Sequence, residues 1–182
     1  MKEIYWSDFA KKDGRFQYLN AFLASIPGML GCKLRTKVIP KYFKAAGNNT
    51  YIDRHVRFYG AHHLSVGNDV AFAEDGFVQA QGGVTIGDNT IFGPGIKIWT
   101  TTHKFGSADV PIAQQGFEKN PVTIGKGVWI GANVFLMPGV RIPDGCVVSA
   151  GAVVGIKEYP SFSIIAGNPA RVIGTREPQE QE

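Results

Sequence analysis

Cysteine is scarce in this chain of 182 residues, and its scarcity excludes a framework of disulfide bonds. Cys32 and Cys146 are the two cysteines, and a fold that depends on disulfides needs more pairs than they can form. The chain must therefore fold by packing alone, and its thiol content suits a reducing compartment. We expect a cytoplasmic protein.

Long apolar runs and a secretory signal are also missing. No apolar segment reaches the length that crosses a bilayer. The first eight residues mix charged and apolar side chains, which is not the pattern of a signal peptide. The hydrophobic share of 44% and the charged share of 19% are those of a globular protein. The length fits one domain, or one domain with an appendage.

Acidic residues are few near the N-terminus. Residues 1–60 hold eleven Lys and Arg against four Asp and Glu, a balance of +7, whereas residues 61–182 hold eight against eleven, a balance of −3. A basic end can meet nucleic acid, an anionic membrane or a phosphorylated substrate. Because no nucleic-acid-binding motif accompanies the charge, we expect no nucleic-acid partner.

A period of six residues organises most of the chain. From Ile124 to Val153, five consecutive blocks of six each begin with an aliphatic residue, and the same period appears upstream with one slip of two residues. The thirteen positions in this period are all apolar: Val66, Phe72, Val78, Val84, Ile86, Phe92, Ile98, Ile124, Ile130, Leu136, Ile142, Val148 and Val154. A short fixed period indicates a repeat architecture.

Each block of six is interpreted as a short strand followed by a corner. Side chains alternate along an extended chain, so the first and fifth residues of a block lie on the same side. Glycine at the second or fourth position supplies the unusual dihedral angles of the corner. Three blocks close one triangular coil, and about five stacked coils form an all-β solenoid, a parallel β-helix. The fifth residues that would point inward are small or β-branched: Val70, Val128, Val134, Val140, Cys146 and Ala152.

Residues 1–50 are interpreted as an N-terminal helical and irregular cap. Phe16, Leu19, Leu23 and Ile26 recur at helical spacing within residues 15–26, and Pro27 ends that helix. The cap would cover the open end of the solenoid. Lysines then alternate with apolar residues up to residue 44, so a compatible second interpretation is a peripheral contact with the inner face of a membrane.

Residues 51–174 form the predicted solenoid domain, and residues 175–182 are a polar tail. A loop over residues 104–120 interrupts the period, and a connection of this length is often functional. Its apolar side chains, Phe105 and Phe117 among them, need a surface to cover, which a neighbouring subunit would supply. His103 stands where this loop leaves the solenoid.

Three strings resemble the hexapeptide-repeat acyltransferases: Val84-Thr-Ile-Gly-Asp-Asn89, Val128-Trp-Ile-Gly-Ala132 and Ala166-Gly-Asn-Pro-Ala-Arg-Val-Ile173. The resemblance covers residues 50–174 and points to the sugar O-acetyltransferase branch. It implies a left-handed β-helix, a homotrimer, and acetyl-CoA as co-substrate without a metal.

The resemblance also implies how acetyl transfer is catalysed. His103 occupies the family's position for the general base, and imidazole titrates near neutrality. The backbone amide of Ala132, from the adjacent subunit, would donate to the oxyanion of the tetrahedral intermediate. Because a thioester is already activated, no nucleophilic serine or cysteine is needed, and direct transfer in a ternary complex is the expected route.

CoA contacts are implied at one aromatic residue and at small residues in corners: Trp129, Ala132, Ala150 and Gly151. Positive charge and the guanidinium fork favour phosphates, which makes three cations candidates for that end of CoA. These are Lys157, Arg171 and Arg176. The corner that contains Lys157 is one residue longer than the family's usual corner.

The candidate acceptor-binding residues are Asp75, Trp99 and Phe105. Asp75 lies in an acidic corner that the family often places near the acceptor, although a solvated turn is the alternative. Ala73 stands where small-sugar relatives carry an asparagine, which argues against a direct transfer of a galactoside or maltose assignment. We expect an O-acetyltransferase that acts on a sugar hydroxyl of a cell-surface polysaccharide, or on its lipid-linked or nucleotide-linked precursor.

Several alternatives stay open at this point. The acceptor could instead be serine, an antibiotic, or an amino sugar acetylated on nitrogen. A non-catalytic hexapeptide-repeat scaffold is an alternative of another class, but it would not need both His103 and the long loop. A metal-dependent lyase built on the same solenoid needs three converging histidines, and after His63 only His103 remains. We therefore expect no metal.

Overall fold

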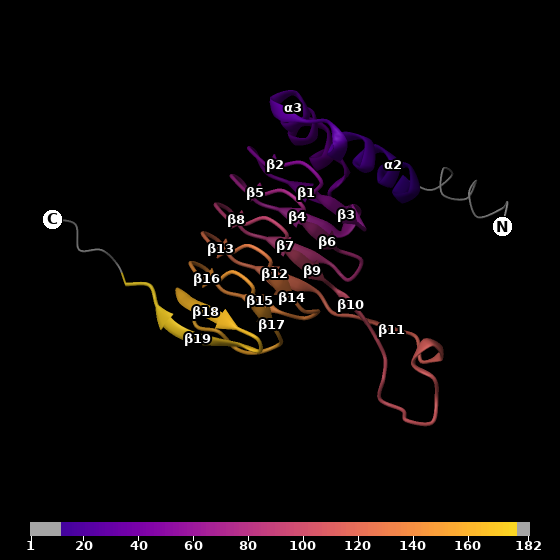
Figure 1. Ribbon diagram of the computed structural model, residues 1–182, viewed down its shortest axis with the longest axis vertical. Coiled ribbons are helices and arrows are strands. Elements are labelled where there is room, and N and C mark those ends of the chain that lie inside the picture. Colours follow the sequence, from indigo (N-terminus) through magenta and orange to yellow (C-terminus); the bar gives the residue numbers. More distant parts are fainter. Residues whose placement is uncertain (1–11, 178–182) are drawn as a thin grey trace.

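The computed structural model describes residues 12–177 and is a parallel β-helix closed at one end by two helices. Its strands form three walls (Figure 1). Wall A contains β1 (Ala45–Ala46), β4 (Leu64–Val66), β7 (Val84–Ile86), β12 (Val122–Ile124) and β15 (Arg141–Ile142). Wall C contains β3 (Arg57–Tyr59), β6 (Phe77–Gln79), β9 (Lys97–Trp99), β14 (Phe135–Leu136) and β17 (Val153–Val154).

Wall B is the longest wall and ends in an antiparallel pair. It contains β2 (Tyr51–Ile52), β5 (Ala71–Phe72), β8 (Ile91–Phe92), β13 (Trp129–Ile130), β16 (Val147–Val148), β18 (Ser163–Gly167) and β19 (Ala170–Thr175). The chain visits walls A, B and C in turn, so five coils are complete and β18 begins a sixth. The predicted fold class, an all-β solenoid with a helical cap and an extended loop, is confirmed.

The interior is filled by the residues that the six-residue period selected. All thirteen periodic positions are buried, and the most exposed of them, Val66, shows 4% of its surface. The small fifth-position residues, Cys146 included, are buried as well. Aromatic rings stack along the axis in the upper coils, with Phe72 and Phe92 parallel and 4.9 Å apart. Burial of this column of side chains is the main stabilising contribution to the solenoid.

The slip of two residues in the period has a structural cause. Tyr51 pairs with Ala71, which makes an upper coil 20 residues long, whereas Trp129 pairs with Val147 in a lower coil of 18 residues. The extra pair lies at the edge between walls C and A, where η2 (Ala61–His63) and the turn before Val84 widen the corner. The wider corners of the upper coils lie at the same edge that later releases the long loop.

Stacked corners share one backbone conformation. At the edge between walls B and C, the third corner residue has a positive φ in all five coils: His55, Asp75, Gly95, Asn133 and Gly151. The edge between walls A and B has the same feature at Asn49, Asp69, Asn89, Gly127 and Gly145. Glycine, asparagine, aspartate and histidine are the residues that adopt this left-handed conformation at least cost.

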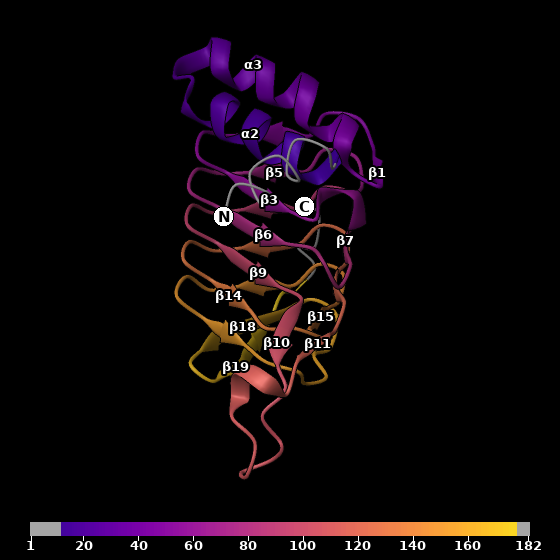
Figure 2. The same ribbon diagram turned by 90° about the vertical axis from the view of Figure 1, so that its right-hand side faces the viewer.

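Two helices, not one, make the cap. α2 (Lys12–Ser25) coincides with the predicted helix, but α3 (Gly28–Val38) and η1 (Ile39–Tyr42) occupy a stretch for which no helix was predicted. Phe16, Leu23 and Ile39 join the solenoid core, so the helices cover the apolar end of the first coil. That coil begins at Ala45, six residues before the predicted start of the solenoid, because β1 pairs with β4. Figure 2 shows α3 as the outermost layer.

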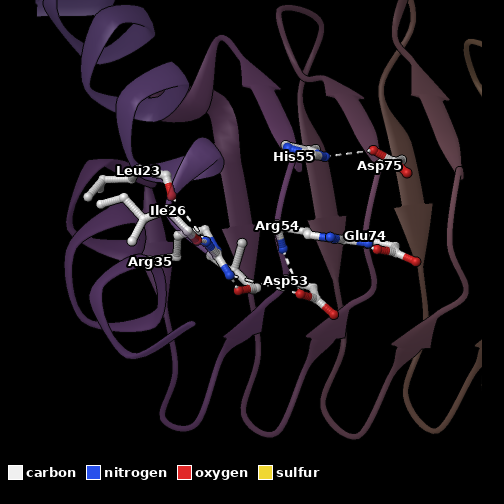
Figure 3. Close-up of polar contacts among 9 residues, drawn as sticks. Leu23, Ile26, Arg35, Asp53, Arg54, His55, Glu74 and Asp75 are labelled. Carbon is white, nitrogen blue, oxygen red and sulfur yellow. Dashed lines mark hydrogen bonds and ion pairs between the residues drawn. The ribbon is translucent and has the colours of Figure 1, made fainter. Parts of the chain in front are cut away.

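Arg35 fastens the cap to the first coil, and it is 1% exposed. Its guanidinium donates hydrogen bonds to the carbonyl oxygens of Leu23 and Ile26 at the end of α2, at 3.1 and 2.7 Å, and to that of Ile52 at 3.1 Å (Figure 3). A cation at a helix C-terminus is favoured by the helix dipole. Asp53 lies 3.9 Å from the same guanidinium.

The predicted loop over residues 104–120 is the outer part of a hairpin. β10 (Thr101–His103) and β11 (Phe117–Lys119) pair antiparallel, and η3 (Ile112–Gln114) lies beyond them. The hairpin projects from the edge between walls C and A, away from the solenoid (Figure 1). Phe105 is 71% exposed and Phe117 is 63% exposed, so the described chain offers these side chains no surface to cover. Among residues 12–177, no helix has the length and apolarity of a membrane span.

Candidate active site

The hairpin that carries His103 is anchored by a buried polar cluster. Thr100 is fully buried, and its hydroxyl donates to the carbonyl oxygen of Gln79 at 2.8 Å and accepts from the amide of Gly82 at 2.8 Å. The carbonyl oxygen of Thr100 accepts from the amide of Asn120, at the return of the hairpin, at 2.8 Å. The side chain of Gln79 also bonds to Thr101. Both arms of the hairpin are thus fixed to the previous coil.

His103 is the last residue of β10 and lies opposite Phe117 in the hairpin. The two rings are 4.3 Å apart, and His103 is exposed. A groove of about 270 Å³ opens beside the imidazole between the hairpin and wall C. Aromatic and apolar side chains line its walls: Trp99, Phe117, Phe135, Met137 and Pro138. A titratable imidazole at the mouth of an apolar groove can remove a proton from a bound hydroxyl.

Ala132 lies at the edge between walls B and C, on the opposite side of wall C from His103. Its carbonyl oxygen accepts from the amide of Gly151 in the next coil at 2.8 Å. Its own amide donates no hydrogen bond within residues 12–177. A Cβ on Gly93 would approach that amide to 2.6 Å, so a glycine in the coil above keeps the space beside it open. A free backbone amide of this kind can stabilise an oxyanion.

Small residues at this edge have a structural reason besides ligand binding. A Cβ at Gly131 would lie 2.6 Å from the amide of Ala150, so successive corners stack at backbone distance. Ala150 and Gly151 are exposed at the edge, next to the corner of Ala132. The three residues therefore form one continuous strip along the solenoid. Trp129 stands on the outer surface of wall B and is 52% exposed.

The three candidate phosphate-binding cations lie at three different edges. Arg171 follows the turn between β18 and β19 and lies at the edge of Ala150. Lys157 follows wall C and leaves toward wall A, on the side of the hairpin. Arg176 donates to the carbonyl oxygen of Gly145 at 2.8 Å, at the edge between walls A and B. A single chain therefore does not gather them into one site.

The candidate acceptor residues are also separated. Trp99 lines the groove beside His103, and Phe105 is exposed in the hairpin loop. Asp75 lies at the edge between walls B and C, where its carboxylate is 3.2 Å from the imidazole of His55 (Figure 3). Beside it, Arg54 and Glu74 form an ion pair at 2.7 Å. Asp75 and His103 thus lie on opposite sides of wall C within one chain.

The remaining histidines follow the interpretation of exposed side chains. His62 pairs with Asp13 of α2 at 2.7 Å, and its ring is 4.0 Å from that of His63. Burial, and then the neighbouring His62, lower the pKa of His63. No group of three or more potential metal ligands forms among the residues that the structure describes.

Sequence reasoning missed Gln79, Thr100 and Thr101, which hold the hairpin. Nothing in a single sequence singles out one buried glutamine, because outward positions of a strand are often polar. The Thr-rich string before His103 was the available signal, and its structural meaning depends on the coil above it. The sequence also gave no sign that His103 and Ala132 lie on opposite edges.

Comparison with known proteins identifies the family. The family model described as "Bacterial transferase hexapeptide (six repeats)" matches residues 121–155. The galactoside O-acetyltransferase of Escherichia coli K12 is 32% identical over 145 residues, which are 76% of this chain and 67% of that protein. The chain belongs to the hexapeptide-repeat acyltransferases, in the branch of the sugar O-acetyltransferases.

Solved structures agree with this assignment. A galactoside acetyltransferase in complex with coenzyme A has a TM-score of 0.73 and 29% identity, over 87% of this chain and 80% of that one. A maltose O-acetyltransferase from Clostridium difficile 630 has a TM-score of 0.71 and 25% identity, over 92% and 88%. A protein of Escherichia coli K12, provisionally named as a lipopolysaccharide biosynthesis O-acetyl transferase, is 36% identical over 99 residues, half of this chain and 49% of that protein. This hexapeptide-repeat protein is an acyltransferase.

Proposed function

We propose that this acyltransferase transfers an acetyl group from acetyl-CoA to a sugar hydroxyl of a cell-surface polysaccharide or its precursor, with His103 as general base. The observation that carries the proposal is the position of His103, exposed at the mouth of an apolar groove on an anchored hairpin. The similarity to galactoside and maltose O-acetyltransferases supports a sugar acceptor. The similarity to a lipopolysaccharide O-acetyl transferase supports a surface glycan.

The proposed chemistry is a direct transfer. The imidazole of His103 takes the proton of the acceptor hydroxyl as its oxygen attacks the thioester carbonyl. The tetrahedral intermediate places its negative charge on the former carbonyl oxygen, toward the free amide of Ala132. Collapse breaks the carbon–sulfur bond, and the thiolate of CoA takes the proton from the imidazolium. The products are the O-acetylated sugar and CoA.

The two catalytic groups would meet between subunits. His103 and Ala132 lie on opposite edges of wall C, so one chain cannot place both beside the same carbonyl carbon. A second copy that brings its strip of small residues against the hairpin of the first completes the site. The exposed Phe105 and Phe117 would then be covered by that copy. Closed rotational symmetry gives each copy one such site, and we propose a homotrimer.

In this assembly CoA would lie along the strip of Ala132, Ala150 and Gly151. The pantetheine arm carries amides that can bond to the backbone exposed there, and the free amides of the strip are suitable donors. Arg171 lies at the same edge and is the proposed phosphate contact. Lys157, on the hairpin side, would reach the same cofactor only from the neighbouring copy. Arg176 is engaged in a corner and would act structurally.

The acceptor would occupy the groove of His103 and extend along the edge between walls C and A. A second hollow of about 480 Å³ lies farther along this edge, between α2 and the upper coils. Gln17, Tyr59 and Gln81 line it, and this mixture of amides with an aromatic ring suits a saccharide. Acceptor sugars longer than one residue therefore have room to continue toward the cap.

The test is acetyl-CoA turnover by the full chain against a panel of saccharides, serine, amino sugars and antibiotics. His103→Ala should lower kcat about 10² to 10⁴-fold while CoA binding is retained, because only proton transfer is lost. His55→Asn is the matched control, since it removes an exposed imidazole at the opposite edge and should leave turnover unchanged. Full activity of His103→Ala would reject the general base, and CoA binding without turnover of any acceptor would favour a scaffold.

The assembly has its own test. Light scattering of the native chain should report the mass of a trimer. A charged side chain in the hairpin, as in Phe117→Asp, should reduce that mass and abolish turnover together. A native monomer with full activity would contradict a site that is shared between copies.

A further inference from the structure

The cap contains a long stretch without acidic residues. From Gly14 to Ile52 the chain has six Lys and Arg and no Asp or Glu: the cations are Arg15, Lys33, Arg35, Lys37, Lys41 and Lys44. Arg35 is buried in the contact with α2, whereas the four lysines are exposed. This excess of positive charge lies at one end of the molecule, on the helices that cover the first coil (Figure 2).

Helical spacing gathers several of these lysines with apolar residues. Along α3, Leu30, Lys33 and Lys37 follow one another at three- and four-residue spacing, and Met29 lies one turn before Lys33, so all four share the outer face of the helix. Met29 is 72% exposed and Leu30 is 67% exposed. Lys41 continues the line one turn later in η1. We name this surface the basic cap face: Met29, Leu30, Lys33, Lys37 and Lys41.

The acidic residues that flank this stretch are already engaged elsewhere. Asp13 forms an ion pair with His62 at 2.7 Å, beside the first coil. Asp53 lies 3.9 Å from the buried guanidinium of Arg35. Neither carboxylate is placed to neutralise the exposed lysines, so the basic cap face keeps its charge.

We propose that the basic cap face binds the surface of an anionic lipid bilayer. Lysines that flank exposed apolar side chains on one face of a helix are the pattern of an interfacial membrane contact, in which the charges meet headgroups and the apolar side chains enter the boundary of the acyl chains. Nucleic acid would satisfy the lysines but not Met29 and Leu30. α3 is the outermost layer of the molecule, so a flat surface can approach it without meeting the hairpin (Figure 2).

This contact would give the proposed acetyl transfer its place. A saccharide precursor carried on a lipid is confined to the membrane surface, and an enzyme that rests there by its cap meets this acceptor more often than one in free solution. The binding itself depends on neither the acceptor nor His103. Failure of the membrane contact can therefore be distinguished from failure of the proposed function.

The test is sedimentation of the full chain with vesicles. The native protein should bind phosphatidylcholine vesicles that contain phosphatidylglycerol, and binding should weaken as salt is raised, because the charges are screened. Pure phosphatidylcholine vesicles should bind much less. The double variant Lys33→Gln, Lys37→Gln should lower the partition coefficient about 30-fold, at the energy of about one exposed cation contact per lysine. Leu30→Ser should lower it about tenfold.

Matched controls separate this surface from general charge and apolarity. Lys97→Gln with Arg141→Gln removes two exposed cations from the solenoid walls, and Ile173→Ser removes an apolar side chain as exposed as Leu30, at 67%, from the other end. Both controls should bind like the native chain, and every variant should keep the native circular dichroism spectrum. Equal loss in variants and controls, equal binding to neutral vesicles, or a fall in oligomer mass on Leu30→Ser would overturn the proposal.

Discussion

The hydroxyl of Thr100 donates a hydrogen bond of 2.8 Å to the carbonyl oxygen of Gln79, one coil above it. The side-chain oxygen of Gln79 in turn accepts from the amide of Thr100 at 2.9 Å. These contacts join the last regular position of wall C to the coil above, at the point where the chain leaves the solenoid. His103 follows three residues later, so the orientation of the proposed base depends on this pair.

Thr100→Val should reduce turnover by about one to two orders of magnitude. The substitution preserves shape but leaves the amide of Gly82 without its acceptor, and a buried unpaired group costs about 1–3 kcal/mol. The hairpin should loosen, and His103 should lose its fixed position. Steady-state kinetics measure the effect.

Thr90→Val is the control for this substitution. Thr90 is equally buried, and its hydroxyl donates to the carbonyl oxygen of Gly125 at 3.0 Å, at the edge between walls A and B. It should lower the melting temperature to a similar degree but leave turnover at native levels. If both variants lose activity equally, Thr100 has no special part in positioning the hairpin.

Gly93→Ala should destabilise the solenoid and impair CoA binding. The new methyl group would lie 2.6 Å from the amide nitrogen of Ala132, so the two coils must separate at their corners. Overpacking of this kind typically costs about 1–3 kcal/mol. Thermal unfolding and CoA titration measure the two effects. Gly106→Ala, in the hairpin loop with no atom within 4 Å of the added carbon, should change neither.

Arg35→Met should lower stability by about 3–5 kcal/mol, since it removes every donor from a buried cluster that joins α2, α3 and the first coil. The carbonyl oxygens of Leu23 and Ile26 would lose their partner. Arg35→Lys should recover only part of the loss, because one ammonium cannot reproduce the fork of the guanidinium. Chemical denaturation measures both variants, and a native free energy of unfolding for Arg35→Met would refute this account of the cap.

His63 should make the fold sensitive to acid. Burial, and next the charge of His62, lower its folded pKa below the ordinary value of 6.5. As pH falls from 6.5 through the folded pKa, the unfolded chain binds this proton first, so stability falls. Above 6.5 the imidazole is neutral in both states and the effect vanishes. Asp13, Lys44 and Lys119 also act on this imidazole, the first raising and the two lysines lowering its pKa.

The corresponding variant is His63→Gln. Unfolding curves across this pH range should show a shallower loss of stability for the variant than for the native chain. His103→Gln, at an imidazole of the distant hairpin, is the comparison and should keep the native slope. Parallel curves for all three proteins would exclude His63 as a source of acid sensitivity.

Much of the solenoid could be predicted from the sequence because its core repeats every six residues. Val66 to Val154 supply one inward aliphatic or aromatic side chain per block, and burial of such a column has few other solutions. α3 could not be predicted in the same way. Its inward face contains Gly31, Cys32 and Arg35, so no apolar stripe marks the helix, and the buried arginine is satisfied only by carbonyl oxygens of α2 and β2.

The candidate site divides along the same line. The sequence singled out His103 and the strip of Ala132, Ala150 and Gly151, because each belongs to a recognisable local string. It could not place them relative to one another. A corner's edge depends on how many residues each coil uses, and coils of 18 and 20 residues alternate with an inserted hairpin.

By itself the sequence determined the period, the inward side chains and the residues able to take left-handed corners, since these are local properties of each block of six. The tertiary structure alone decided which corners stack, and with them that His103 and Ala132 face away from each other across wall C. It also decided that Lys157, Arg171 and Arg176 lie at separate edges and that the lysines of α3 point outward. Those relationships arise from coil closure and from packing between distant segments, which no single stretch of the chain encodes.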